Sequence, residues 1–207
     1  MTAGYPVTLL MEGRSCLVVG GGRVASRKAV GLLDAGAVVH MVAPRVSPEA
    51  EVLAASGLTI EFRPYRSPEA ASYRLVVAAT GDPEVDGAVF RDAEAAGVWV
   101  NAADDPVSCS FHLPAVARRG PVSVAVSTGG ASPALASWLR DRIETVLGSG
   151  ADIEVLADLL SEARAALKAA GQSTETANWR GALDSDMLGL IRTGQIDQAR
   201  ERLRACL

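Results

Sequence analysis

Short runs of apolar residues alternate with alanine-rich stretches along the first half of the chain. Five of these runs, rich in β-branched residues, span 15–19, 38–42, 59–62, 75–79 and 98–101. These runs are mostly apolar instead of alternating regularly with polar residues, which is typical of strands buried on both faces. The alternation of such strands with helical segments predicts an α/β fold with a parallel sheet covered by helices.

The second half of the chain has a different pattern. A sixth apolar run over 122–126 leads into a segment that predicts a helix over 132–147. Beyond it, alanine, leucine and charged residues dominate and no strand pattern recurs, with further helices expected over 174–193 and 195–206. Residues 151–207 are therefore predicted to form a small all-helical C-terminal domain.

Composition and charge argue against a nucleic-acid-binding protein and against a membrane protein. The 207 residues include 20 basic and 24 acidic side chains, a formal charge of −4 at pH 7. A nucleic-acid-binding protein needs a basic surface, so no nucleic-acid partner is expected. No apolar run approaches the roughly 18 residues that cross a bilayer, and the N-terminus lacks a signal-peptide pattern. With three scattered cysteines that fit a reducing compartment, we expect a cytoplasmic protein without a membrane segment.

A glycine-rich turn directly follows the first predicted strand. Residues 20–25 read Gly-Gly-Gly-Arg-Val-Ala, which fits the pattern G-x-G-x-x-G/A. In this pattern Gly20 permits the tight turn, Gly22 lets the backbone approach a pyrophosphate, and Ala25 packs the helix against the strand. The helix that begins near Arg23 directs its free amides at the phosphates. The turn therefore predicts a dinucleotide site in a Rossmann-like sheet.

The residues at the end of the second predicted strand do not distinguish an NAD site from an NADP site. An acidic residue there would bind the ribose hydroxyls of NAD, whereas an arginine could accommodate the 2′-phosphate of NADP. This chain reads Ala43-Pro44-Arg45, and Arg45 is explained equally well as a solvated loop residue. After the fourth strand, Thr80 could line the cofactor at the same sheet edge, although an ordinary turn is a close alternative.

Two adjacent carboxylates, Asp104 and Asp105, follow the fifth predicted strand. Removal of a hydride from a carbon is easier when a base accepts a proton from the substrate. Asp105 is followed by proline, and Asp-Pro is a common turn initiator, which explains Asp105 better than Asp104. Asp104 is therefore the candidate catalytic residue.

A second anion-binding loop is expected before the helix over 132–147. The loop residues proposed to contact substrate are Ser127, Thr128, Gly129, Gly130 and Ser132. Ser132 is a good N-cap and Pro133 suits the first helical position. A capped helix N-terminus that binds no ligand therefore explains this segment equally well. The free amides and the helix dipole would favour a carboxylate. Together with a cradle for cofactor phosphates, the loop suggests an acidic substrate.

One face of the same predicted helix is apolar. Its stripe consists of Leu135, Trp138, Leu139, Ile143 and Val146. In a chain of this size, such a stripe beside a separate helical domain indicates a partner chain, with packing inside its own domain as the alternative. A homodimer is therefore expected.

Several ordered motifs resemble the precorrin-2 dehydrogenase / sirohydrochlorin ferrochelatase family, whose module also forms the N-terminal half of fused siroheme synthases. The matching segments, in chain order, are CLVVGGGRVA over 16–25, Arg27-Lys28, NAADDP over 101–106, CSF over 109–111, LPA over 113–115 and STGGASP over 127–133. The match runs over residues 5–147 and continues more loosely beyond.

The resemblance implies a Rossmann domain over 1–113, a dimerisation segment over 114–150 and a helical domain over 151–207. It implies NAD-dependent oxidation of precorrin-2 to sirohydrochlorin, with the family's essential aspartate at Asp104. The implied NAD contacts fall on Arg23, Val24, Pro44 and Arg45. The chain departs from the family at Asp86-Gly87, where an asparagine is frequent.

Two alternative functions stay open at this point. A bifunctional enzyme would also insert Fe²⁺ into sirohydrochlorin. The only histidines are His40 and His112, no cluster has metal-ligand spacing, and His112 is better explained as a core or cleft residue. A non-enzymatic dinucleotide-sensing module would explain the first 100 residues but leave Asp104 and the loop over 127–133 without a role.

Overall fold

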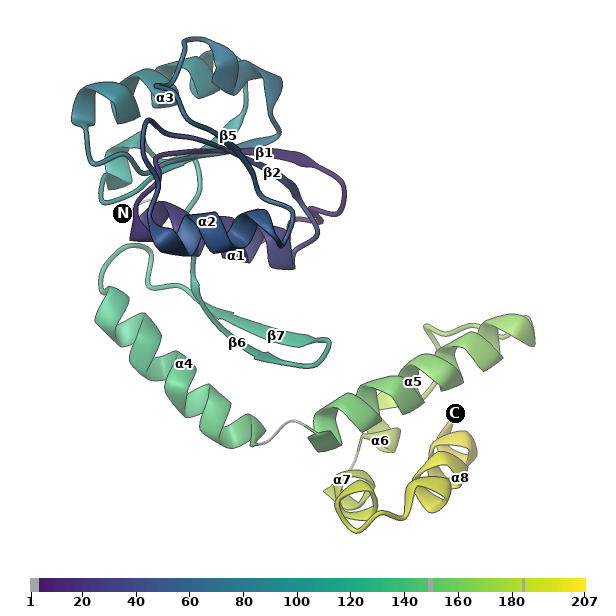
Figure 1. The fold of residues 1–207 in the computed structure, drawn as a ribbon. Helices are drawn as coiled ribbons and strands as arrows, with labels where there is room; N and C mark the ends of the chain where they lie inside the picture. Colours follow the sequence, from purple (N-terminus) through teal and green to yellow (C-terminus); the bar gives the residue numbers. More distant parts are fainter. Residues whose placement is uncertain (1–3, 149–150, 184) are drawn as a thin grey trace. The chain divides into compact units, whose positions relative to one another are not determined.

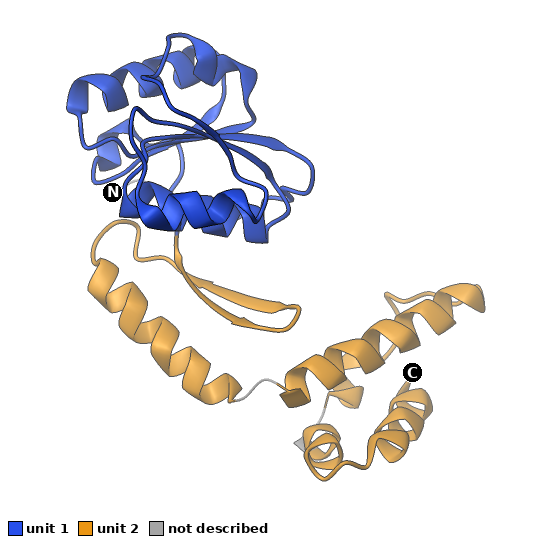
Figure 2. Ribbon diagram, in the orientation of Figure 1, with its two compact units in different colours: residues 1–113 blue, residues 114–207 orange. Residues whose placement is uncertain are grey.

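A computed structural model describes residues 4–148, 151–183 and 185–207. The chain divides into two compact units, residues 1–113 and residues 114–207 (Figure 2). The three-part division expected from the sequence stays a prediction. In the described part of the chain, no helix is both long enough and apolar enough to cross a bilayer.

The first unit is built on a five-stranded parallel sheet with the order β3-β2-β1-β4-β5. Its strands are β1 (Ser15–Val19), β2 (Val38–Val42), β3 (Thr59–Glu61), β4 (Leu75–Ala78) and β5 (Trp99–Ala102). Each strand falls on a run predicted from the sequence, so the predicted parallel α/β sheet is confirmed. The chain moves outward from β1 in one direction to β2 and β3 and in the other to β4 and β5, which places a topological switch point between β1 and β4.

Helices cover both faces of this sheet (Figure 1). α1 (Arg23–Asp34) and α2 (Pro48–Ala54) pack on one face, and α3 (Pro83–Ala95) packs on the other. Alternate residues of β1 enter the two apolar cores, because Cys16 and Val18 face α1 while Leu17 and Val19 face α3. A strand buried on both faces has no polar side, which explains the apolar runs of β1 and β4, whereas the edge strand β3 is largely exposed and carries Thr59 and Glu61.

The second unit begins with an antiparallel hairpin of β6 (Ala115–Arg119) and β7 (Val122–Val126), followed by α4 (Pro133–Leu147). The sequence predicted β7 and α4 but not β6. This hairpin is only partly buried, and β6 ends on two arginines, so its pattern lacks the continuous apolar run of the first sheet.

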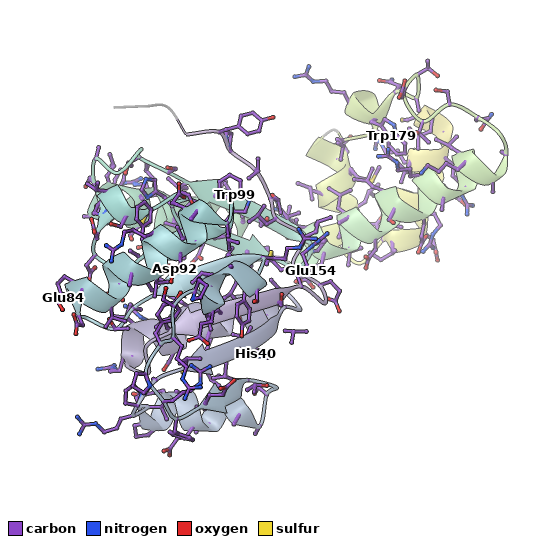
Figure 3. All side chains as sticks on the ribbon, turned by 90° about the horizontal axis from the view of Figure 1, so that it is seen from above. His40, Glu84, Asp92, Trp99, Glu154 and Trp179 are labelled. Atoms are coloured by element: carbon purple, nitrogen blue, oxygen red, sulfur yellow. The ribbon has the colours of Figure 1, made fainter. Side chains whose placement is uncertain are left out.

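The remainder of the second unit is helical, as predicted. It contains α5 (Ala151–Ala169), α6 (Trp179–Ala182), α7 (Ser185–Arg192) and α8 (Ile196–Cys206) around a small apolar core. The single helix predicted over 174–193 is wrong. The Trp179 indole, labelled in Figure 3, donates a hydrogen bond to the Thr174 carbonyl, and the Asn178 side chain accepts from the Gly181 amide, so a helix start replaces a continuous helix.

Candidate active site

The turns that follow β1, β4 and β5 lie side by side at the carboxyl edge of the sheet. The Ala79 amide donates to the Val19 carbonyl at 2.8 Å, and the Ala103 amide donates to the Ala78 carbonyl at 2.8 Å. Parallel pairing therefore continues one residue past the strands and brings the glycine turn, Thr80 and Asp104 to the same edge. Ligands of open α/β sheets bind at this edge, beside the switch point.

The three glycines of the first turn have different roles. Gly20 has φ +117°, and a Cβ there would overlap the Ala79 carbonyl oxygen. A Cβ on Gly21 would overlap the Arg45 carbonyl oxygen, whereas a Cβ on Gly22 would meet no atom within 4 Å. Gly20 and Gly21 are thus required by the fold itself, while the open space at Gly22 leaves room for a phosphate to approach the backbone.

The distribution of acidic residues at the helix N-termini also favours a phosphate at the start of α1. Of the helices with eight or more residues within 4–148, 151–183 and 185–207, only α1 and α4 have no acidic residue in the first turn. A carboxylate in the first turn satisfies the positive end of the helix dipole, so its absence leaves that end to an external anion. The residues present at the start of α1 therefore fit the pyrophosphate of a dinucleotide.

The loop after β2 is hydrogen-bonded to the glycine turn. The Ser47 amide donates to the Gly21 carbonyl at 2.7 Å, and the hydroxyl groups of Ser26 and Ser47 lie 3.3 Å apart. The predicted cofactor residues Pro44 and Arg45 are exposed in this loop. Loop and turn are therefore held together, with both predicted residues accessible to a ligand.

The predicted residues on α1 are arranged according to their place in the helix. Arg23 is exposed and lies 3.6 Å from the Glu49 carboxylate, Val24 is half-buried, and Ala25 is fully buried against the sheet. The packing role expected for Ala25 is consistent with this burial.

Thr80 forms its hydrogen bonds within its own loop. Its hydroxyl donates to the Asp86 carboxylate at 2.7 Å and accepts from the Asp82 amide at 3.0 Å, and its amide also donates to Asp86 at 3.1 Å. Asp86 thus orders this turn. With its hydroxyl proton used, Thr80 can line a cofactor through its methyl group and backbone.

The two adjacent aspartates differ in the way the sequence suggested. Asp105 caps a short 3-10 helix (Pro106–Ser108) by accepting from the Val107 amide, and the hydrogen bond with the Ser108 side chain is the largest cause that lowers its pKa. The exposed Asp104 carboxylate has no hydrogen-bond or ion-pair partner within the described residues. Its φ of +62° is the only positive value of a non-glycine residue in that part of the chain. Strained backbone of this kind is concentrated at functional sites.

Sequence reasoning gave no role to Lys28 and Asn101. The Lys28 ammonium donates to the Asn101 side-chain oxygen at 3.3 Å, across 73 residues of sequence, beside the turn that carries Asp104. One signal that could have drawn attention to Lys28 is composition, because the chain has only two lysines among its 20 basic residues.

The second predicted anion loop belongs to the second unit. The Ser132 side chain accepts from the Leu135 amide at 3.1 Å, so its predicted N-cap role is present. Thr128 exchanges two hydrogen bonds with the Ser132 backbone, and the Ser127 hydroxyl accepts from the Gly129 amide. The Gly130 amide has no partner in the described part of the chain and remains available for an anion.

The histidines do not assemble a metal centre in the described ranges, where no group of three His, Cys, Asp or Glu side chains could hold an ion. His40 stacks edge-on against Tyr73 with ring centroids 5.7 Å apart, which is a packing role. His112 is exposed.

Comparison with protein families identifies the sheet unit. The family described as "Putative NAD(P)-binding" matches residues 7–115, more than half of the chain. The chain belongs to this NAD(P)-binding family. A second family, "Sirohaem biosynthesis protein central", matches residues 119–145. The predicted resemblance and the predicted nicotinamide dinucleotide are therefore confirmed.

Individual relatives agree with the family match. The chain is 38% identical over 205 residues to a siroheme synthase of Nitrosococcus oceani, covering 98% of this chain and 43% of that protein. It is 43% identical over 165 residues to a siroheme synthase of Methylococcus capsulatus, covering 78% of this chain and 35% of that protein. The chain thus spans less than half the length of these relatives.

A solved structure matches nearly the whole chain. It is that of SirC, a precorrin-2 dehydrogenase, with a TM-score of 0.76 and 27% sequence identity. The match covers 96% of this chain and 100% of that one. The fold is therefore shared from the sheet to the C-terminal helices.

Proposed function

We propose that the protein is an NAD-dependent dehydrogenase that oxidises precorrin-2 to sirohydrochlorin. The observation that carries the proposal is Asp104, an exposed carboxylate without a partner among the described residues, on a left-handed backbone at the edge that also holds the dinucleotide cradle. The likeness to SirC, described as a precorrin-2 dehydrogenase, supports the same reaction.

The oxidation removes two hydrogens from the substrate, one as a hydride and one as a proton. Bound NAD supplies the acceptor for the hydride. We assign the proton to the Asp104 carboxylate, which has no hydrogen bond to the described residues to break first. A positioned proton acceptor of this kind contributes about 10²- to 10⁴-fold to a rate.

Substrate binding is assigned to the loop before α4. Precorrin-2 carries acetate and propionate side chains, which are anions at neutral pH. The free Gly130 amide and the uncompensated start of α4 offer such a carboxylate a hydrogen bond and a favourable dipole. The Ser127, Thr128 and Ser132 side chains hold the loop in shape and so keep that amide available.

A turnover assay separates this proposal from the sensing alternative. Purified protein is mixed under anaerobic conditions with precorrin-2 and either NAD or NADP, and absorbance is followed for both the tetrapyrrole and the reduced cofactor. A dehydrogenase produces sirohydrochlorin, with faster turnover expected for NAD. A sensing module binds the dinucleotide and leaves precorrin-2 unchanged.

The protein is further proposed to be a cytoplasmic homodimer. α4 carries an outward apolar surface in which Leu135, Trp138 and Val146 are exposed by 46, 52 and 84%. Leu139 and Ile143, also in the predicted stripe, are half-buried. A two-stranded hairpin with one helix is a thin layer, and such a layer gains most from covering its exposed apolar face.

The dimer prediction is tested with Trp138→Asp. Placing a carboxylate at the centre of the exposed stripe should convert a dimer into a monomer at micromolar concentration, because burying an unpaired charge is strongly unfavourable. The matched control is Val52→Asp, an exposed valine of α2 (71%). Light scattering should show a dimer for the wild type and the control, and a monomeric wild type would contradict the proposal.

A further inference from the structure

Lys28 is a half-buried lysine that reaches from α1 to the last turns of the sheet. Its neighbours in the helix, Ala25 and Ala29, are fully buried, so Lys28 lies at the border of the face that packs on the strands. Side chains of a helix point toward its N-terminus, which here is the carboxyl edge of the sheet. The ammonium accordingly lies 3.3 Å from the side-chain oxygen of Asn101 near the end of β5.

Asn101 fixes the position of this ammonium. The asparagine is buried, with 6% of its surface exposed. Its amide nitrogen donates to the Phe111 carbonyl at 3.0 Å and to the Cys109 sulfur at 3.4 Å. With both donor directions occupied by acceptors, the amide oxygen must face the lysine. The segment that turns through Asp104 and returns along β5 therefore holds Lys28 as well.

The Lys28 ammonium lacks a counter-ion within the part of the chain that the structure describes. No carboxylate of the described residues lies within 4 Å of it, and the Asn101 oxygen is its one hydrogen-bond acceptor there. An ammonium has three donors, so two remain unused. Burial is the largest cause that lowers the pKa of Lys28, and the negative charge of Asp104 acts in the opposite direction. A half-buried cation with free donors is stabilised by an anionic ligand.

Two anions reach this edge under the proposed function, the cofactor pyrophosphate and a carboxylate of the substrate. The pyrophosphate belongs at Gly22 after β1, whereas the Lys28 ammonium is held at Asn101 in β5, two strands away in the sheet order β1-β4-β5. Lys28 instead shares the β5 segment with Asp104. We propose that Lys28 is a substrate-binding residue that pairs with a carboxylate of the tetrapyrrole while Asp104 receives the proton. This inference rests on the proposed function.

Variants of α1 test the pairing by binding as well as by turnover. Lys28→Met keeps the apolar stem and removes the charge, so it should weaken sirohydrochlorin binding and raise KM for precorrin-2 by about 10- to 100-fold, the worth of one charge-assisted hydrogen bond. The Kd for NAD should not change, and Lys28→Arg should recover part of the loss. Arg27→Met removes the same charge from the adjacent exposed position and should change none of these values.

A labelling experiment on the wild type does not depend on whether a variant folds. The chain has two lysines, Lys28 and the exposed Lys168, so each amine can be followed by mass spectrometry after trace acetylation. Sirohydrochlorin should slow acetylation of Lys28 by about tenfold or more, because a bound carboxylate raises the pKa of the amine and covers it. Lys168 should be unaffected, and NAD alone should not protect Lys28.

The outcomes separate this inference from the proposed function. Equal labelling of Lys28 with and without sirohydrochlorin overturns the pairing, as does a Lys28→Met protein with wild-type affinity for the tetrapyrrole. An equal loss in Arg27→Met also overturns it. A wild-type protein that binds sirohydrochlorin with protection of Lys28, yet does not oxidise precorrin-2, keeps the pairing and removes the proposed dehydrogenase function.

Discussion

Asp104→Asn is expected to lower the dehydrogenase turnover number by about 10²- to 10⁴-fold, because it removes the proposed proton acceptor. The substitution is chosen to leave the backbone undisturbed. Asp104 has φ +62°, a left-handed conformation that asparagine tolerates as well as aspartate does. The carboxylate has no hydrogen-bond partner in the described residues, so no internal contact is lost. Thermal stability and NAD affinity should therefore stay close to those of the wild type.

Asp105→Asn is the matched control for this experiment. Its carboxylate caps the short helix at Pro106–Ser108, and an asparagine can accept the same hydrogen bond from the Val107 amide. We expect a much smaller loss of turnover. Wild-type turnover in Asp104→Asn, or an equal loss in both variants, would assign the proton to another group, and the pH dependence of the rate would then locate it.

Gly22→Val is expected to weaken NAD binding by about 100-fold or more without unfolding the protein. A Cβ at this position meets no protein atom within 4 Å, so the added side chain occupies the open space at the start of α1. That space is where the pyrophosphate must approach the backbone amides, and losing two charge-assisted hydrogen bonds of about 1.5 kcal/mol each accounts for the factor. Titration with NAD and thermal unfolding measure the two effects separately.

Gly20→Ala provides the contrast. Gly20 has φ +117° and lies against the Ala79 carbonyl, so an added Cβ strains the turn and forces the strand ends apart. The result should be a lower unfolding temperature, whereas Gly22→Val should leave the unfolding temperature close to that of the wild type. If Gly22→Val bound NAD as the wild type does, the phosphate would not lie at this turn.

The sheet could be predicted from the sequence because each buried strand leaves a short apolar run, and such runs recur between helical segments. A strand buried on both faces must be apolar at nearly every position, and the central strands β1 and β4 show this pattern. β6 escaped prediction because a half-exposed hairpin strand does not require such a run. The helix predicted over 174–193 failed because the Trp179 and Asn178 hydrogen bonds outweigh an otherwise helical composition.

The candidate site was only partly predictable for a similar reason. Gly22 and Asp104 stand directly after strands, so their place at the sheet edge follows from chain order. The pairing of Lys28 with Asn101 joins residues 73 positions apart, and it depends on how the segment after β5 folds back along the sheet. No periodicity encodes such a contact. The sequence offers only the rarity of lysine and the place of Lys28 in the Arg27-Lys28 motif as signals.

The most direct test of the dehydrogenase function is the stoichiometry of the reaction. Wild-type protein is incubated anaerobically with precorrin-2 and excess NAD, without added metal, and both sirohydrochlorin and NADH are quantified by absorbance. Because one hydride leaves the substrate in each oxidation, equal amounts of NADH and sirohydrochlorin are predicted, with formation of both greatly slowed in Asp104→Asn. Binding of NAD without formation of either product, or sirohydrochlorin formed without NADH, would contradict the proposed function.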